Sequence, residues 1–303
     1  MNFVRFLQDL RSKDLSLAGG KGANLGELMH AGMRVPSGFV LTTDGYRRCV
    51  PAVSLLELDL VNLPSLEQKT MDIQEQIKGI SIPEDVELEI LHAYRSMGSP
   101  VVAVRSSATA EDLPSASFAG QQETYLNVQG ESAVLESVKK CWASLWSSRA
   151  VQYRAWQGFG ASDVALAVVI QEMAPYETSG VAFTVNPLSN ETSELIINAA
   201  PGLGEALVQG EIVPDQWIAR RPDGAVLRFT PSPRSKQSAP GLFGSQRSSR
   251  GCLTSQQVRH LSQLCLRIED HFHSIPQDIE WSYGLGEFYL LQSRPITTLN
   301  KVK

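Results

Sequence analysis

Short apolar runs alternate with amphipathic segments along the whole chain, and this alternation limits the fold more than any other feature. Apolar runs of strand length that are bounded by Gly and Pro are typical of central strands in a covered sheet. Segments in which apolar residues recur every three or four positions are typical of helices that pack on one side. The pattern therefore predicts an α/β or α+β fold and argues against a helical bundle or a β-sandwich.

The same periodicities place the main elements, and no internal repeat is present. Helices are predicted over residues 23–30, 82–97, 131–156 and 255–272. Strands are predicted over residues 38–41, 101–104, 124–128, 165–171, 180–184, 194–199, 278–283 and 287–292. Segment 231–251 interrupts the pattern because it contains basic residues and no acid, and we expect a surface loop there.

Composition narrows the class of protein. A chain of 303 residues holds about two structural units at roughly 150 residues each. The net charge of −5 argues against a general binder of nucleic acid or acidic membranes, because phosphate contacts need an excess of Lys and Arg. No apolar run is long enough to cross a membrane or to resemble a signal peptide. The four cysteines form no C-x-x-C pair, so we expect free thiols and a cytoplasmic protein.

The first candidate site is the glycine-rich run from Gly19 to Gly26, which contains Lys21. Glycines let backbone N–H groups approach an anion, a helix N-terminus favours negative charge, and Lys21 adds a cation. The run does not match the P-loop pattern G-x-x-x-x-G-K-[ST]. Taken alone, a glycine-rich helix entry of this kind is more often a simple turn at the start of a helix than an anion site.

Two further candidates follow along the chain. Arg105 ends a buried strand and precedes small hydroxyl residues, so it can act as a phosphate clamp or pair with a carboxylate. The run from Ser117 to Tyr125 can form a lid over a nucleotide, with its amides and the Thr124 hydroxyl on phosphate oxygens. An isolated hairpin with no ligand is the alternative.

The fourth candidate lies on the last two predicted strands. Paired antiparallel strands place Glu280 and Gln292 on one face, where their oxygens suit Mg²⁺. Arg294 then adds positive charge for a polyphosphate. The alternative is a pair of amphipathic strands whose outer residues only face solvent.

Together these segments resemble one known family. The runs are GGKGANLGEL, VPSGFVLTTDGY, VAVRSSATAEDLPSASFAGQQETYLNV, SGVAFTVNP, GLGEALVQGEIVPD, DIEWSYG and FYLLQSRPI. They are similar, in this order, to the N-terminal ATP-binding domain shared by phosphoenolpyruvate synthase, pyruvate phosphate dikinase and rifampin phosphotransferase. The resemblance extends from residue 19 to residue 296, and several co-linear runs are far more specific than one glycine motif.

The resemblance implies an ATP-grasp fold in which two lobes clamp ATP. A larger lobe of residues 1–115 and 200–303 would carry the phosphate and Mg²⁺ residues, and a smaller lobe of residues 116–199 would carry the lid and the adenine hinge. Carried over by motif position, the catalytic residues would be Lys21, Arg105 and Arg294. The residues implied to bind the nucleotide and its metal are Lys21, Arg105, Gly120, Gln121, Gln122, Thr124, Gln171, Glu172, Met173, Glu280, Gln292 and Arg294. Among them, Glu280 and Gln292 would bind Mg²⁺, and residues 171–173 would receive the adenine edge.

The resemblance also implies a partner. In the family, the β-phosphoryl group of ATP passes to a histidine in a Gly-Gly-x-x-(Ser/Thr)-His context on a separate domain, and none of the five histidines here has that context. We therefore expect a histidine-bearing phosphocarrier domain or subunit, with AMP and phosphate as products and a small molecule as final acceptor. Whether the chain is a free-standing subunit or part of a longer enzyme stays open.

Two other functions remain. One is a self-sufficient ATP-grasp kinase or ligase, for which the basic segment 231–251 could supply an anionic-substrate site. The other is a nucleotide-sensing subunit without turnover. The complete set of phosphate and Mg²⁺ residues argues against a sensor, because a sensor could lose Arg294 or Glu280 without penalty.

Overall fold

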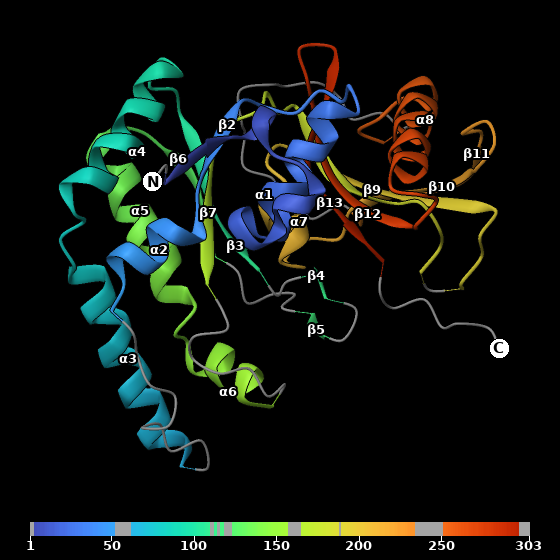
Figure 1. Ribbon diagram of the computed structural model, residues 1–303. Coiled ribbons are helices and arrows are strands. Elements are labelled where there is room, and N and C mark those ends of the chain that lie inside the picture. Colours follow the sequence, from blue (N-terminus) through green and yellow to red (C-terminus); the bar gives the residue numbers. More distant parts are fainter. Residues whose placement is uncertain are drawn as a thin grey trace. The chain divides into compact units, whose positions relative to one another are not determined.

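The computed structural model describes residues 3–51, 62–109, 112–113, 116–117, 123–156, 165–187, 189–233 and 251–296 (Figure 1). The chain divides into two compact units. The N-terminal unit contains Met1–His30 and Pro36–Met173, and the C-terminal unit contains Ala31–Val35 and Ala174–Lys303. Helices and antiparallel sheets occur in both units, so the expected mixed α+β class is confirmed.

The units differ from the expected lobes, which joined residues 1–115 to 200–303 and set 116–199 apart. Sheet hydrogen bonding explains the difference. Strand β7 (Leu166–Glu172) pairs with β2 and β3, whereas β8 (Thr178–Phe183) pairs with β9 and β12. The boundary therefore falls after Met173, between two strands that the expected division kept together.

The N-terminal unit is built on a five-stranded sheet in the order β1-β2-β7-β3-β6, in which all neighbours are antiparallel. Its strands are β1 (Val4–Phe6), β2 (Gly38–Leu41), β7, β3 (Val102–Ala108) and β6 (Thr124–Val128). Helix α1 (Leu15–His30) and helix α5 (Glu131–Ser144) both contact β3 and β7 (Figure 1). Every residue of β3 is buried, and the apolar residues at its start, Val102 to Val104, are typical of a strand that is covered on both faces.

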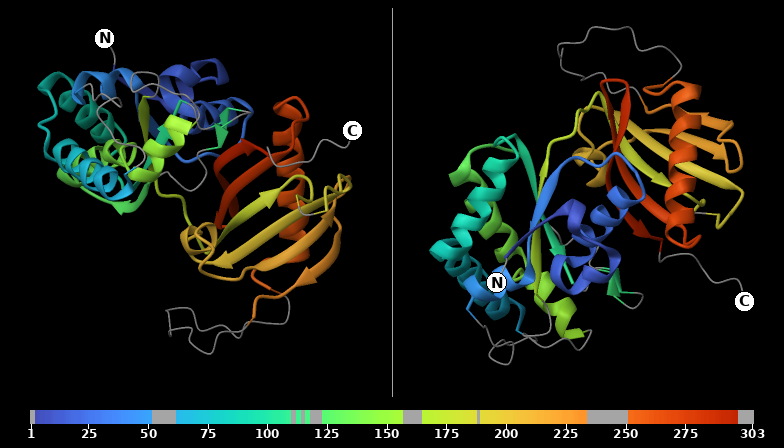
Figure 2. Two further views of the ribbon diagram at one scale, coloured as in Figure 1. Left: turned by 90° about the horizontal axis from the view of Figure 1, so that it is seen from below. Right: turned by 45° about the horizontal axis from the view of Figure 1, so that its top comes forward.

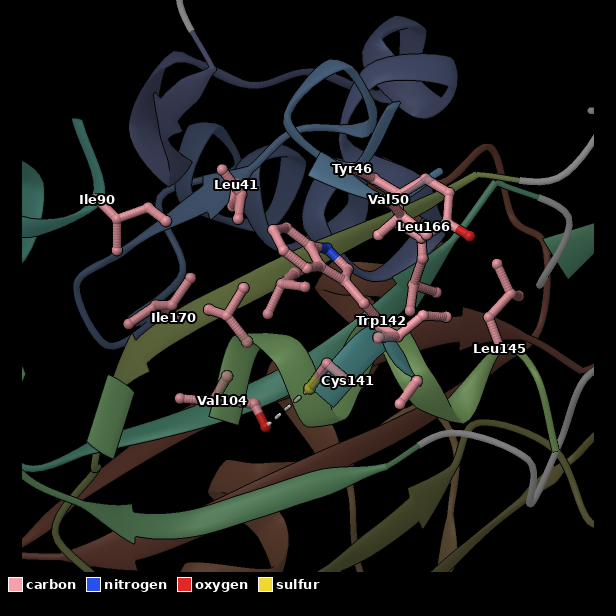
Figure 3. Packing of buried hydrophobic residues seen from close by; sticks show 14 of the residues in the cluster. Leu41, Tyr46, Val50, Ile90, Val104, Cys141, Trp142, Leu145, Leu166 and Ile170 are labelled. Carbon is pink, nitrogen blue, oxygen red and sulfur yellow. Dashed lines mark hydrogen bonds between the residues drawn. The ribbon is translucent and has the colours of Figure 1, made fainter. Parts of the chain in front are cut away.

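The core of this unit lies between the sheet and α5 (Figure 3). Trp142 is fully buried and packs edge-on against Tyr46, with ring centroids 6.2 Å apart. The residue directly before it in α5 is Cys141, whose thiol donates to the Val104 carbonyl oxygen at 3.8 Å. The aromatic contact packs α5 against the helix that carries Tyr46, and the Cys141 hydrogen bond joins α5 to β3. Such aromatic packing buries a large apolar area.

The other described elements of the unit are the 3₁₀ turns η1 (Leu7–Asp9) and η2 (Ser12–Asp14), the strands β4 (Asp112–Leu113) and β5 (Ala116–Ser117), and the helices α2 (Thr43–Cys49), α3 (Leu63–Gly79), α4 (Glu84–Ser96) and α6 (Ser148–Trp156). The single helix predicted over residues 131–156 is wrong, because α5 ends at Ser144 and α6 begins at Ser148. Buried Arg154 stabilises the break by donating to the Leu145 carbonyl oxygen at 2.7 Å. Burial lowers the pKa of the Arg154 guanidinium to about 10.

The C-terminal unit is built on a six-stranded antiparallel sheet in the order β11-β10-β9-β8-β12-β13. The further strands are β9 (Glu194–Pro201), β10 (Asp215–Arg220), β11 (Val226–Thr230), β12 (Gln277–Gly284) and β13 (Glu287–Pro295). A two-residue turn joins β12 to β13, and its residues Leu285 and Gly286 have φ of 54° and 81°. Positive φ at both positions is the signature of the type I′ turn that suits a twisted hairpin.

Helix α8 (Ser255–His271) lies along one face of this sheet (Figure 2). Thr254 begins it with a capping box that includes Gln257. Its apolar side packs on the sheet face that carries Ile279 and Trp281, both fully buried. We call the opposite face, which α8 does not cover, the distal face.

Helix α7 (Glu205–Val208) completes the described elements. Most of the basic segment 231–251 lies outside the described residues. In the part of the chain that the structure describes, no helix combines the length and the apolar character that a membrane span requires.

Candidate functional site

The glycine motif is fixed to strand β3 in the N-terminal unit. Helix α1 is interrupted at Gly19, whose φ of 68° and ψ of 171° are not helical. The Ser107 hydroxyl donates to the Ala18 carbonyl oxygen at 2.8 Å and accepts from the Gly22 amide at 3.1 Å. A side chain at Gly19 would place its Cβ 2.2 Å from the Ser107 carbonyl oxygen. Only glycine permits this close approach, so the motif forms a kinked helix entry clamped by Ser107.

Lys21 is positioned by this clamp. Its side chain is 5% exposed, and its Nζ donates to the Ser106 carbonyl oxygen at 2.8 Å. Ser106 directly follows Arg105 on β3, an inner strand of the sheet, so this hydrogen bond holds the side chain of Lys21 from α1 beside the strand that carries Arg105. The hydroxyl residues after Arg105 have structural partners, because Ser106 donates to the Glu123 carbonyl oxygen and Ser107 holds α1.

Strand register brings three further predicted residues to the α1 side of the sheet. Arg105 lies opposite Thr124 on β6 and opposite Val169 on β7, and Ala103 lies opposite Gln171. Residues directly opposite each other share a face, and so do alternate residues along a strand. Arg105, Thr124 and Gln171 therefore share the face of Ser107, which contacts α1.

Hydrogen bonds to backbone carbonyl oxygens hold the predicted hinge, residues 171–173, in place. Gln171 is 2% exposed and donates to the Pro36 carbonyl oxygen at 3.4 Å. The Glu172 amide donates to Ser37 and the Met173 amide to Val101, at 2.8 and 2.9 Å. Met173 is also the last residue of the N-terminal unit, so the predicted adenine hinge coincides with the junction between the units.

The predicted lid cannot be placed in the same way. Gly120, Gln121 and Gln122 lie outside the described residues. Thr124, the fourth lid residue implied to bind the nucleotide, is described, and it lies half-buried at the start of β6.

The C-terminal unit carries the second group of predicted residues. Glu280 lies directly opposite Gln292, and Asp278 lies directly opposite Arg294, on the hairpin of β12 and β13. The predicted pairing of Glu280 with Gln292 is therefore confirmed. Ile279 and Trp281 point to the α8 side, so alternation places Glu280, Gln292, Asp278 and Arg294 on the distal face.

A β-bulge follows this group. Glu280 pairs with Gln292 but Trp281 pairs with Leu290, which leaves Leu291 as the extra residue. Bulges re-aim side chains and are frequent beside active sites. Here the bulge lies directly beside the Glu280–Gln292 pair.

Asp278 is a site residue that the sequence reasoning did not single out. Both Nε and Nη2 of Arg294 donate to its Oδ2, at 2.9 and 2.8 Å. Burial raises the pKa of Asp278, the charge and hydrogen bond of Arg294 lower it, and the nearby charge of Glu280 raises it. Asp278 thus orients the planar guanidinium of Arg294. Asp278 precedes Glu280 by two residues on a predicted strand, and alternate strand residues share a face, so this spacing could have indicated it from the sequence.

Glu280 and Gln292 fit a magnesium ion. Side chains directly opposite each other on antiparallel strands have Cβ atoms about 4.5–5.5 Å apart, so both oxygens can reach one ion. Mg²⁺ prefers oxygen ligands and commonly takes one or two protein groups together with substrate phosphates. Among the described residues, no cluster of three or more His, Cys, Asp or Glu side chains is arranged to hold a metal.

Comparison with known proteins gives a consistent assignment. A family model described as "Pyruvate phosphate dikinase, AMP/ATP-binding domain" matches residues 15–303. A probable phosphoenolpyruvate synthase of Methanocaldococcus jannaschii is 40% identical over 326 residues, covering 100% of this chain and 27% of the relative. A rifampicin phosphotransferase of Streptomyces sviceus is 41% identical over 315 residues, covering 98% of this chain and 36% of the relative. The chain thus spans well under half the length of these relatives.

Similarity to solved structures is much weaker. The ADP complex of N5-carboxyaminoimidazole ribonucleotide synthetase is 10% identical, with a TM-score of 0.39, covering 94% of this chain and 47% of that one.

Proposed function

Because this chain belongs to the family of pyruvate phosphate dikinase AMP/ATP-binding domains, we propose that it binds Mg-ATP and starts a dikinase-type phosphoryl transfer. The β-phosphoryl group passes to a histidine on a partner domain or subunit, with AMP and phosphate as products. The two units are the two lobes of an ATP-grasp module, and each supplies one group of nucleotide-binding residues.

The distal-face group carries this proposal. It combines a carboxylate, an amide oxygen and a guanidinium within two adjacent residue pairs of one hairpin, Glu280 with Gln292 and Asp278 with Arg294. Phosphoryl transfer needs charge neutralisation and positioning more than covalent chemistry from the protein. A bound Mg²⁺, held by Glu280 and Gln292, would supply Lewis-acid neutralisation of phosphate oxygens. Arg294, oriented by Asp278, stabilises negative charge on the transferred group.

The N-terminal group supplies the remaining charge. Lys21 and Arg105 bind phosphate oxygens, and Thr124 adds a hydroxyl donor on the same face as Arg105. Gly120, Gln121 and Gln122 are proposed to cover the phosphates as a lid. Residues 171–173 bind the adenine edge, which the position of Met173 at the unit junction supports.

The acceptor histidine is proposed to belong to a partner. On the C-terminal unit, His260 packs edge-on against Phe288 with ring centroids 5.6 Å apart. Phe288 lies opposite Tyr283 and so faces α8, away from Glu280. A His260 imidazole therefore does not share the face that carries the metal residues. The final small-molecule acceptor is bound by a further domain or protein.

We also propose a cytoplasmic location. Cys141 and Cys265 are buried free thiols. Disulfides are rare in reducing compartments, and unpaired buried thiols suit such a compartment.

Product analysis tests the proposed reaction. Purified chain is incubated with Mg-ATP, with and without a histidine-bearing phosphocarrier domain of a phosphoenolpyruvate synthase. We expect AMP only when that domain is present, together with a phosphorylated histidine. ADP formation by the chain alone would instead support a self-sufficient kinase or ligase. Binding without any turnover in either mixture would support a sensor.

Replacement of Glu280 by Ala tests the metal site. The variant should lose about 10²–10³-fold in AMP formation, because one preorganised electrostatic group is removed at the reacting phosphates. Its thermal unfolding should stay close to that of the wild type, since a half-exposed carboxylate contributes little to the core. Glu287→Ala is the matched control, because Glu287 belongs to the same hairpin but pairs with Arg34 at 3.7 Å. An unchanged rate for Glu280→Ala would remove Glu280 from the mechanism.

A further inference from the structure

Two amides extend the polar row that contains Glu280. Glu280 lies opposite Val181, Val181 lies opposite Asn198, and Asn198 lies opposite Gln216. Since directly opposite residues share a face, Asn198 and Gln216 are on the distal face with Glu280 and Gln292. Neither the motif reading nor the family resemblance assigned a role to these two amides.

The Gln216 side chain fixes the orientation of Asn198. Its Nε2 donates to Asn198 Oδ1 at 3.0 Å. An asparagine amide has one acceptor oxygen and one donor nitrogen with two hydrogens. Because the oxygen is used by Gln216, Asn198 presents Nδ2 as a donor at a partly exposed position on the distal face.

The distance to the metal residues limits what Asn198 can contact. Strands β9 and β12 are separated by β8, so Asn198 lies two strand spacings, about 9–10 Å, from Glu280. Magnesium ligands lie about 2.0–2.1 Å from the ion, so Asn198 cannot share an ion with Glu280. An amide donor has no anion preference of its own and suits any acceptor oxygen.

We propose that Asn198 Nδ2 donates a hydrogen bond to an oxygen of the bound nucleotide outside the metal-bound part, and that Gln216 is its positioning residue. The inference rests on the proposed function, since it takes the nucleotide to lie on the distal face. The acceptor is a sugar hydroxyl or a phosphate oxygen. The structural alternative is that the two amides only join β9 to β10.

A Gln216→Glu substitution separates these roles. A glutamate can accept but not donate, so Asn198 must turn its Nδ2 toward Glu and its oxygen toward the nucleotide. The cross-strand hydrogen bond is kept while the donor to the nucleotide is lost. Calorimetric titration of the full chain with Mg-ATP should show about 3- to 10-fold weaker binding, the worth of one hydrogen bond. The denaturation midpoint should not change.

A double-mutant cycle removes the effect of the added charge. Asn198→Ala should weaken Mg-ATP binding by a similar factor, and Gln216→Glu in the Asn198→Ala background should weaken it little further. If Gln216→Glu weakens Mg-ATP binding just as strongly in that background, the charge of the new carboxylate acts directly on the nucleotide. That result would overturn the proposal that Gln216 acts by positioning Asn198. If Asn198→Ala binds Mg-ATP as tightly as the wild type but is less stable, the two amides serve only to join β9 to β10. That result would also overturn the proposal.

Analogues identify the acceptor oxygen. If Asn198→Ala weakens Mg-ATP but not 2′-deoxy-ATP, the acceptor is the 2′-hydroxyl. If it weakens both equally and leaves AMP binding unchanged, the acceptor is an oxygen of the β- or γ-phosphate. Failure of the wild-type chain to bind Mg-ATP would contradict the proposed function itself. Wild-type binding that these variants leave unchanged would contradict only the role of Asn198.

Discussion

The Ser107 hydroxyl links the glycine motif to the first sheet with two hydrogen bonds. It donates to Ala18 and accepts from Gly22, and its side chain is fully buried. Loss of this group leaves a buried carbonyl and a buried amide without their partner, which costs more than the loss of an exposed hydrogen bond. It also releases the segment that carries Lys21.

Ser107→Ala should therefore lower the free energy of unfolding by about 1–3 kcal/mol. It should also weaken Mg-ATP binding, since Lys21 loses its fixed position. Ser137→Ala is the matched control, because Ser137 is buried in the same unit but only donates to Ala133 within α5, at 2.8 Å. Chemical denaturation and calorimetry measure the two effects. If both variants have the same free energy of unfolding, the Ser107 hydroxyl does not stabilise the contact between α1 and β3.

The positions of candidate residues were predictable where a motif and a short turn fix the strand register, and they were not predictable where tertiary contacts decide them. Glu280 and Gln292 could be paired from sequence because one hairpin with a short turn fixes their register. Ser107 could not be told from a ligand-facing hydroxyl, since its partners in α1 lie more than 80 residues away along the chain. For Asp278, the sequence indicated only that it lies two residues before Glu280, and not that it binds Arg294.

At the level of elements, the kink of α1 decides where the glycine motif points. Gly19 has a positive φ and closely approaches Ser107, so two separate constraints require glycine there. With φ 68° and ψ 171°, Gly19 lies in a region that is essentially restricted to glycine, and such a backbone costs another residue about 1–3 kcal/mol. A clash with backbone adds to this cost, because β3 is buried and cannot move freely.

Gly19→Ala should accordingly destabilise the protein by about 1–3 kcal/mol more than Gly98→Ala. Gly98 belongs to the same unit and also has a positive φ of 84°, but a Cβ there would meet no atom within 4 Å. The comparison isolates the steric term from the backbone strain. Urea denaturation of both variants measures it, and equal losses would mean that α1 can shift away from β3.

Several elements could not be read from the sequence. Helix α3 buries only Leu66, Thr70 and Ile77, so its apolar pattern is sparse. Strand β11 has no buried residue and forms the edge of its sheet. The break between α5 and α6 was missed because apolar spacing continues through Leu145 and Trp146. In each case tertiary packing, which sequence periodicity does not report, decides the outcome.

For the whole molecule, the division into units follows sheet pairing over long sequence separations. Strand β7 joins β2 and β3, and β8 joins β9 and β12, although β7 and β8 are neighbours in sequence. Nothing in the sequence of either strand indicates its partner, so the expected lobe boundaries differ from the observed units. The class of fold was predictable because apolar periodicity reports it directly.

The central claim is that the Lys21 group of the N-terminal unit and the Arg294 group of the C-terminal unit bind one nucleotide. Calorimetric titration of Mg-ATP into the wild-type chain, Lys21→Met and Arg294→Met tests this directly, with thermal unfolding as the check on folding. The account predicts one site per chain and at least about tenfold weaker binding in each variant, the loss of a charge-assisted contact. Wild-type affinity in either variant, with its fold intact, would contradict the claim that both units hold the same nucleotide.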